Sequence, residues 1–548
     1  MPYLPKILPT SRTPEPTPPK SLTPSVSRMV ETLAKQSSAQ IDEDVPKIEV
    51  HDTVSNVAWA YEKLRQAIDY QDEHLLRKNA IERILRRRLT SGVTAEQLAD
   101  PLVLELIRGR YLPNNTLPTT VIQQAEEIIN RYIHLWSAAP TQPNERDQQR
   151  LFDWYLGLLA VQLNELFTPP THDEALVHLM FHVTHRDIAF AEGEMGEAEK
   201  NTQLYVAIHR ALLKSDSNII RFHLFLRQHP EWQQPSAEVI QRLGRALPQI
   251  RQHIESQLLH PAGELLQRLM KKYTIIFLLL GDIIKTEDSA GPTLLSQPDE
   301  LVETIATAYA GRRKTVTWKI ARNVIRSIIY VFLTKMLLTL VIEVPVDRLF
   351  FGQNIDYTPL IINTVFPPLL LLLIGITIRP PGRKNEQAVM AKVQDLVYRG
   401  DERHALVKPR KPIRRSALFT AIYRIVYGLT FFVVFGFLIA MLTYYHFTPV
   451  STFIFLLFLT IVSFFGIRVR LLAKELLVVD QRENIFTVLF DFLTVPILQV
   501  GRWIALRAPK INVFIFFLDV IIEAPFKAFL EATEGFLGFL REKREEIY

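Results

Sequence analysis

The sequence contains no cysteine in 548 residues and only 20 glycines. Without cysteine, disulfides and thiolate zinc sites are excluded. Runs of period-two alternation are also missing, whereas apolar residues recur at helical spacing, as in the stripe Ile122, Ala125, Ile128 and Ile129. Proline-bearing breaks separate such stripes, which predicts an all-α fold.

Common reaction motifs are also absent. The sequence has no glycine-rich phosphate-binding loop ending in Lys-Ser or Lys-Thr, and it has no Gly-x-Ser-x-Gly motif. Residues 310–315 contain the residue types of a phosphate-binding loop, but their spacing does not match the motif. The acidic, glycine-bearing segment 192–197 lacks the alternating oxygen ligands of an EF-hand. These absences lower the expectation of an enzyme without excluding one.

A long segment of the chain has no charged residues: no Asp, Glu, Lys or Arg occurs between Arg424 and Arg468. A helix needs about 20 apolar residues to cross a bilayer core, so this run can cross, turn near residues 444–449 and cross back. Residues 357–378 are equally uncharged, and residues 327–344 form a weaker apolar run. We therefore predict a polytopic membrane protein with four transmembrane helices at about 324–344, 358–378, 419–444 and 449–467.

The Lys and Arg residues are distributed on one side of these spans. They precede the first span, fill the segment between the second and third, and follow the fourth, whereas Arg348 is the only cation in the other two loops. Loops with this asymmetry place the basic side in the cytoplasm. Both termini are therefore expected to be cytoplasmic, and no secretory signal peptide is recognised at the start.

Four regions follow from this reading. Residues 1–45 are rich in Pro, Ser and Thr and are predicted to be a disordered tail, because such a composition buries too little surface. Residues 46–311 are expected to form a large cytoplasmic helical domain, and residues 312–478 the transmembrane region. Residues 479–548 are expected to hold amphipathic helices at the membrane interface and a charged tail. An extra membrane hairpin at 485–500 and 511–530 stays open as an alternative.

The C-terminal segment carries Val-Ile-Ile-Glu-Ala-Pro-Phe-Lys at 520–527 and Arg-Glu-Lys-Arg-Glu-Glu at 541–546. It resembles the C-terminus of multi-pass bacterial membrane proteins that have no assigned activity. The resemblance covers about the last tenth of the chain. It implies a location in the bacterial cytoplasmic (inner) membrane and implies nothing about chemistry.

Polar residues inside the spans are the first candidate site. Lys335 lies at mid-span, where a charge is costly and marks a functional-site hypothesis. Thr339 and Glu343 follow on nearly the same face, and Asn363 is the main polar residue of the second span. A buried structural pair is favoured over an ion path, with Glu343 ranked before Asp491 and Asp519 as the partner of Lys335.

Three further groups are candidates. His178, His182 and His185 follow helical spacing and could bind a divalent metal, although a polar helix face explains them more simply. The second group consists of acidic residues at the membrane interface: Asp491, Asp519 and Glu523. The third group consists of basic residues that could contact lipid headgroups: Arg312, Arg313, Lys314, Arg410, Lys411, Arg414 and Arg415.

The resulting expectation is a non-enzymatic membrane anchor or scaffold for a cytoplasmic protein partner. The first alternative is a small transporter or channel that uses Lys335 and the second span, which holds Pro367 and Pro368. The second alternative is a membrane-bound metalloenzyme. Membrane lipids with anionic headgroups are expected to bind the protein, and nucleic acid is not. No resident cofactor is expected, and homo-oligomerisation is left open.

Overall fold

The computed structural model describes most of the chain as helices and their connections. The described residues are 21–37, 46–50, 75–89, 94–186, 188, 190, 195–286, 294–351, 357–378, 381–399, 417–474, 476–477 and 485–507. Within them, the β-structure consists of isolated bridges, such as the antiparallel one between Lys47 and Pro118. Four of the helices are long and apolar enough to cross a membrane. The prediction of an all-α polytopic membrane protein with four transmembrane helices is therefore confirmed.

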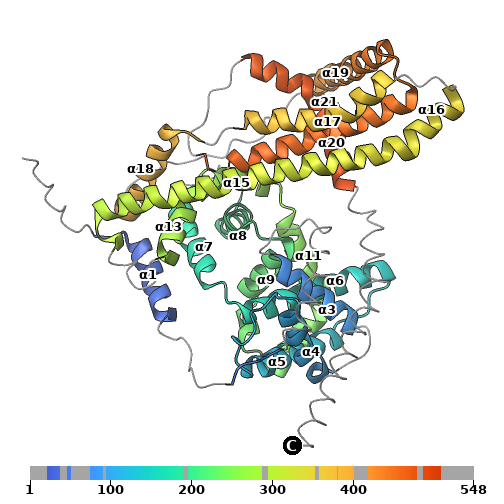
Figure 1. The fold of residues 1–548 in the computed structure, drawn as a ribbon. Helices are drawn as coiled ribbons and strands as arrows, with labels where there is room; N and C mark the ends of the chain where they lie inside the picture. Colours follow the sequence, from blue (N-terminus) through green and yellow to red (C-terminus); the bar gives the residue numbers. More distant parts are fainter. Residues whose placement is uncertain are drawn as a thin grey trace, which may run out of the picture. The chain divides into compact units, whose positions relative to one another are not determined.

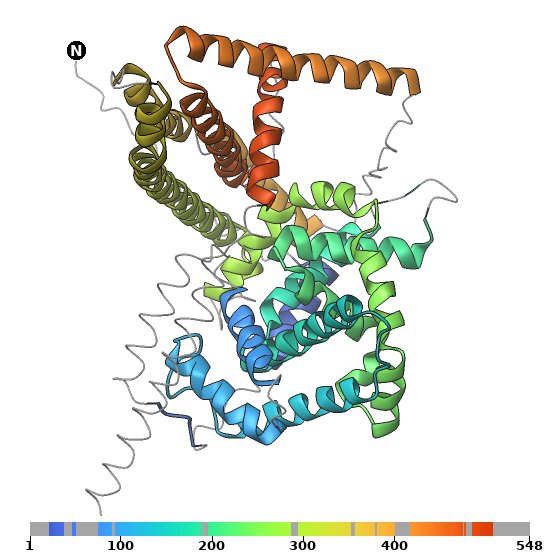
Figure 2. The same ribbon diagram turned by 90° about the vertical axis from the view of Figure 1, so that its right-hand side faces the viewer.

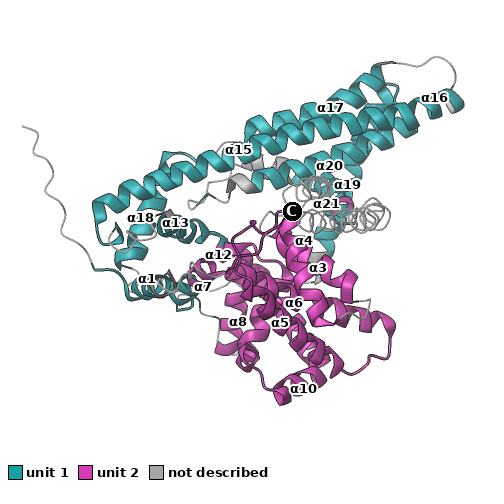
Figure 3. Cartoon of the chain, turned by 60° about the horizontal axis from the view of Figure 1, so that its bottom comes forward, with its two compact units in different colours: residues 1–35, 178–190, 271–503 teal, residues 36–177, 191–270, 504–548 magenta. Residues whose placement is uncertain are grey.

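The chain divides into two compact units, coloured separately in Figure 3. Unit 1 comprises residues 1–35, 178–190 and 271–503, and unit 2 comprises residues 36–177, 191–270 and 504–548. The predicted boundary at residue 311 falls inside helix α15 (Pro298–Leu338), which is continuous across it.

Unit 2 is a helical body with its own core. Several of its helices begin at a residue whose side chain caps the free backbone N–H groups, as Asn144, Asp216 and Ser236 do. Its helices are α3 (Leu76–Leu89), α4 (Ala95–Arg108), α5 (Thr120–Ser137), α6 (Glu145–Phe167), the start of α7 (Thr171–Thr184), α8 (Glu197–Ile208), the π-helical η2 (His209–Leu213), α9 (Ser217–Gln228), η3 (Pro230–Gln233), α10 (Ala237–Arg245), α11 (Leu247–Leu258) and α12 (Gly263–Lys271).

Aromatic side chains fill the centre of unit 2. Trp232 is fully buried, and its ring meets Tyr132 edge-on with centroids 5.2 Å apart and Phe225 at 5.5 Å. The indole N–H of Trp232 donates a 3.0 Å hydrogen bond to Gln162, so this polar group has a partner inside the core. Unit 2 therefore buries its apolar stripes within itself.

Unit 1 contains the four apolar helices. Its central helix α15 lies beside α17 and α20, as Figure 1 shows. The first candidate span, Pro298–Val346, comprises α15 and the helical segments that continue it. Its apolar part is the C-terminal part, from about residue 327. The helices of unit 1 are α1 (Pro24–Ser37, as far as residue 35), the end of α7, α13 (Thr274–Thr286), α15, the π-helical η4 (Thr339–Glu343), α16 (Val344–Phe351), α17 (Tyr357–Thr377), α18 (Arg383–Arg399), α19 (Ala417–Tyr444), α20 (Pro449–Lys474) and α21 (Ile485–Arg507, as far as residue 503).

Two apolar clusters join the membrane helices. Ile320 and Val324 of α15 pack on Val469 of α20 at one end of the bundle. Leu442 of α19 and Phe455 of α20 pack together near the turn that joins these helices. Beyond this turn α19, drawn in orange in Figure 2, diverges from α20. Most of its apolar side chains are exposed, as expected for a helix that faces lipid.

Helix α21 packs against the membrane helices. Gly501 lies so close to α20 that an added Cβ would clash with the Thr460 carbonyl oxygen. The Tyr427 hydroxyl of α19 donates a 2.6 Å hydrogen bond to Gln499. The segment predicted to be interfacial thus contacts α19 and α20 directly over these residues. Residues 511–530 lie outside the described residues.

The segment predicted to be a disordered tail differs from the prediction over Pro24–Ser37, which forms helix α1. Val26 and Met29 are buried, and Thr23 bonds to α18 through its amide at 2.9 Å from the Val397 carbonyl. The Pro-rich composition concealed this helix, because its few apolar residues lie on one face and find a partner only in the folded chain.

Candidate functional site: a polar cluster within the membrane helices

Lys335, Thr339 and Glu343 project from the end of the first candidate span towards its neighbours. Residues eight apart on an α-helix are about 80° out of phase, because each residue turns the chain by about 100°. The π-helical segment Thr339–Glu343 holds more residues per turn, which reduces this rotation and returns Glu343 towards the face of Lys335. The local helix geometry therefore brings the two charges together.

Glu343 is the centre of the cluster, and it is fully buried. Its Oε1 accepts hydrogen bonds from the Asn363 amide at 2.6 Å and from the Ser451 hydroxyl. Its Oε2 accepts one from the Thr339 hydroxyl at 3.0 Å and lies 3.8 Å from the Lys335 ammonium. Both oxygens thus face donors from η4, α15, α17 and α20, which satisfies most of the acceptor capacity of a carboxylate.

Lys335 is also fully buried. Its Nζ forms an ion pair with Glu343 but no hydrogen bond with the described residues, and it stands 5.2 Å from the centroid of the Phe458 ring of α20. An ammonium over an aromatic face is attracted to the negative face of the ring. The carboxylate and the ring together offset the loss of water around this cation.

The structure thus gathers the four predicted intramembrane polar residues into one cluster. The sequence reasoning missed two members, Ser451 and Phe458. Ser451 follows the helix-starting Pro449 by two residues, so its position at the first turn of a span was visible. Its direction was not, because that depends on how α20 packs on α17.

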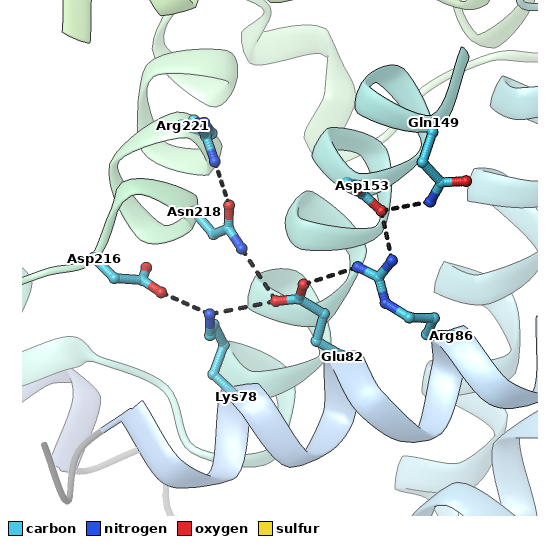
Figure 4. A network of polar contacts seen from close by, with 8 residues as sticks. All are labelled: Lys78, Glu82, Arg86, Gln149, Asp153, Asp216, Asn218 and Arg221. Carbon is cyan, nitrogen blue, oxygen red and sulfur yellow. Dashed lines mark hydrogen bonds and ion pairs between the residues drawn. The ribbon is translucent and has the colours of Figure 1, made fainter. Parts of the chain in front are cut away.

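A second buried lysine lies in unit 2, shown in Figure 4. The ammonium of Lys78 on α3 stands 2.6 Å from Asp216 and 3.5 Å from Glu82. Glu82 also accepts from Asn218 of α9 and from Arg86, which itself bonds to Asp153 of α6. The network joins three helices and reaches the surface at Arg86 and Asp153, whose side chains are about two-fifths exposed.

A histidine and glutamate cluster lies elsewhere in unit 2. His223 Nε2 is 2.9 Å from Glu165 and 3.4 Å from Glu174, and His209 lies beside it with ring centroids 5.0 Å apart. Burial acts to lower the pKa of His223, but the hydrogen bond and charge of Glu165 and the charge of Glu174 outweigh it, so this pKa is raised. Burial raises the pKa of Glu174.

The predicted histidine face has a different arrangement. His178 and His182 are exposed, and His185 stacks on Phe181 with its Nδ1 2.9 Å from the His182 carbonyl oxygen. Burial and the charges of neighbouring cations lower the pKa of His182. The described residues contain no group of three or more His, Asp or Glu side chains that could hold a metal ion, the predicted histidines included.

The predicted basic and acidic residues divide into paired, exposed and undescribed groups. Arg312 bonds to Asp282 of α13 with a 2.8 Å contact, Arg313 lies 4.0 Å from Glu386 of α18, and Lys314 is exposed. The remaining predicted residues have no described side chain: Asp491, Asp519, Glu523, Arg410, Lys411, Arg414 and Arg415.

Three comparisons with known proteins give no match for this chain: no family model, no curated protein and no solved structure matches it.

Proposed function

We propose that this protein is a membrane anchor that holds a helical body, unit 2, at the membrane as a scaffold for a protein partner. The observation that carries the proposal is the division of the chain into four membrane-length apolar helices and a separate helical body with its own core. Such a body needs no bilayer to bury its apolar surface, so it is available for contacts in the aqueous phase.

The polar cluster supports a structural role in the anchor. Each oxygen of Glu343 is engaged by donors from the protein itself, and Lys335, Glu343 and Asn363 are fully buried. A group that binds and releases an ion needs a coordination position open to that ion. The closed arrangement instead joins α15, α17 and α20, as polar residues do at membrane helix interfaces.

A transporter is the second candidate. Two observations favour it: a π-helical segment beside intramembrane charges, and the Lys335 ammonium without a hydrogen bond among the described residues. Under this alternative, proteoliposomes holding the purified protein collapse an imposed pH or ion gradient faster than empty vesicles. Under the anchor proposal their leak rates are equal.

Topology is tested by cysteine labelling, because the native chain has no cysteine to give background. Gln387→Cys and Tyr445→Cys each introduce a thiol at an exposed position, in α18 and in the turn between α19 and α20. We expect an impermeant thiol reagent to label Tyr445→Cys in intact cells with a permeabilised outer membrane, and Gln387→Cys only after lysis. Labelling of Gln387→Cys in intact cells contradicts the proposed orientation.

The scaffold itself is tested by cross-linking in native membranes followed by mass spectrometry on the full-length protein. We expect repeated cross-links between one protein species and the surface lysines of unit 2, such as Lys214. Cross-links confined to the membrane helices, or to copies of the chain itself, contradict the scaffold.

A further inference from the structure

One face of α15 carries cations immediately before the helix enters its apolar span. Between Glu303 and Glu343 the chain has no Asp or Glu, and its Lys and Arg residues precede the apolar run from residue 327, apart from Lys335. The face opposite the packed residues holds Lys314, Trp318, Lys319, Arg322 and Arg326. A net positive surface therefore stands where the helix emerges from the apolar layer.

Helix packing fixes which side of α15 this face occupies. Val316, Ile320, Val324 and Ile328 follow four-residue spacing and pack towards Val469 and Phe465 of α20. A helix turns about 100° per residue, so Trp318 and Arg322 lie about 160° from Ile320 around the helix axis. The cationic face thus points away from the bundle, and Trp318 is 63% exposed.

Ion pairing separates these cations from their neighbours in sequence. Arg312 is engaged by Asp282 and Arg313 stands near Glu386, so both serve the packing of α13 and α18 on α15. In the outward group, the Arg322 guanidinium lies 5.0 Å from the centroid of the Trp318 ring. This cation–π contact holds the guanidinium against the Trp318 ring on the same face of the helix.

The apolar residues of the same face locate it at the membrane boundary. Ile325 and Ile329 continue the stripe and are more than half exposed, and Tyr330 is 71% exposed. Trp and Tyr concentrate at the headgroup level of membranes, where one end of the ring is in contact with hydrocarbon and the other with water. Cations and Trp318 thus occupy the N-terminal part of this face, and exposed aliphatic residues and Tyr330 follow towards the apolar span, as expected where a helix enters a lipid leaflet.

We propose that this face, formed by Lys314, Trp318, Lys319, Arg322 and Arg326, binds the phosphate headgroups of anionic phospholipids. Arginine and lysine supply the hydrogen bonds and charge that a phosphate requires, and the aliphatic side chains below accept the acyl chains. The site goes beyond the anchor role, because it selects the lipid that surrounds the anchor. It does not depend on whether unit 2 recruits a partner.

The test compares the full-length protein with a triple variant, Lys314→Gln/Lys319→Gln/Arg322→Gln. A matched control, Arg150→Gln/Arg242→Gln/Arg268→Gln, removes the same charge from exposed positions of unit 2. Native mass spectrometry measures the binding of phosphatidylglycerol relative to phosphatidylcholine. Each cation near an anionic surface contributes a factor of about five, so we expect the triple variant to lose more than about tenfold in this preference. The control keeps it.

A charge-conserving variant, Lys314→Arg/Lys319→Arg/Arg322→Lys, should retain the preference and shows that a loss reflects charge rather than misfolding. Retention of the preference by the glutamine variant, or an equal loss in the control, overturns the proposal. A single-stranded oligonucleotide supplies the competing arm. If it binds the wild type through the same three residues while phosphatidylglycerol shows no preference, the face binds nucleic acid and the lipid assignment is wrong.

Discussion

The protein buries two lysines, and the two regions that hold them offset the burial in different ways. Lys78 in unit 2 has two carboxylates within 3.5 Å, and the side chains of both are partly exposed to water. Lys335 has one carboxylate at 3.8 Å, and both side chains are completely buried. In unit 2 the charge of Lys78 is neutralised by Asp216 and Glu82, and Glu82 is also paired with Arg86. In the membrane helices, neutral Thr, Asn and Ser donors complete the hydrogen bonding of Glu343.

This difference follows from the solvent. An aqueous rim can stabilise a surplus charge, so the network around Lys78 can extend through Arg86 and Asp153 to the surface. Lipid offers no such rim, and every extra charge there adds a large desolvation cost. The membrane cluster therefore contains one cation and one anion, and its remaining members are uncharged. It follows that removing a charge should cost more in the membrane helices than in unit 2.

The largest effect is expected for Lys335→Met. It leaves Glu343 charged and buried without its cation, which costs about 3–5 kcal/mol of stability by analogy with broken buried pairs. Denaturant unfolding of the full-length protein in detergent measures this loss. Thr334→Val is the control, because the half-buried Thr334 hydroxyl donates to the Tyr330 carbonyl of its own helix, and its effect should be small.

A smaller effect is expected for Lys78→Met. Asp216 still caps α9 through the Ile219 amide, Glu82 still bonds to Asn218 and Arg86, and both carboxylates can draw in water. We expect a loss of about 1–2 kcal/mol, measured by hydrogen exchange of α3 and α9. A loss for Lys78→Met as large as that for Lys335→Met would remove the contrast between the two regions.

The smallest effect is a pH dependence confined to unit 2. The raised pKa of His223 means that the folded state holds its proton more tightly than the unfolded chain does. The stability from this group is complete below about pH 6.5 and is lost as the pH rises through its folded pKa. Glu174, whose pKa burial raises, acts in the same direction at lower pH.

We therefore expect His223→Gln to flatten the fall in unfolding free energy of unit 2 from pH 6 to higher values. Hydrogen exchange of α9 at several pH values measures it in the full-length protein. His253→Gln replaces an exposed histidine of α11 and should leave the wild-type slope intact. A steeper fall in the His223 variant than in the wild type would contradict the proposed pairing with Glu165 and Glu174.

The transmembrane spans could be predicted from the sequence because few backbone structures are stable within the lipid hydrocarbon. A backbone in hydrocarbon must satisfy its own hydrogen bonds, so long uncharged runs such as residues 425–467 can be assigned without knowledge of their neighbours. The pairing of Lys335 with Glu343 was also the first choice, because the two share one helix. Ser451 and Phe458 could not be assigned, since their contacts depend on how α20 packs.

Other features depended on long-range packing. The first span is the C-terminal part of a helix that starts at Pro298. The N-terminal half of this helix is charged, so the sequence does not indicate that the two halves form one continuous helix. The histidine and glutamate cluster joins Glu165, Glu174 and His223 from three helices, so no local spacing reveals it. By contrast, the spacing of His178, His182 and His185 was conspicuous, and two of the three are exposed on the helix surface.

We propose that the Lys335–Glu343 cluster holds the membrane helices together and is closed to transported ions. A double-mutant cycle tests it most directly, with Lys335→Met, Glu343→Gln and the combination compared by denaturant unfolding and by proton flux in proteoliposomes. We predict that each single variant is destabilised, that the double variant loses much less than the sum of the two, and that no variant or wild type conducts above empty vesicles. Flux in the wild type that Lys335→Met abolishes, with unfolding midpoints unchanged in all three variants, would contradict the account.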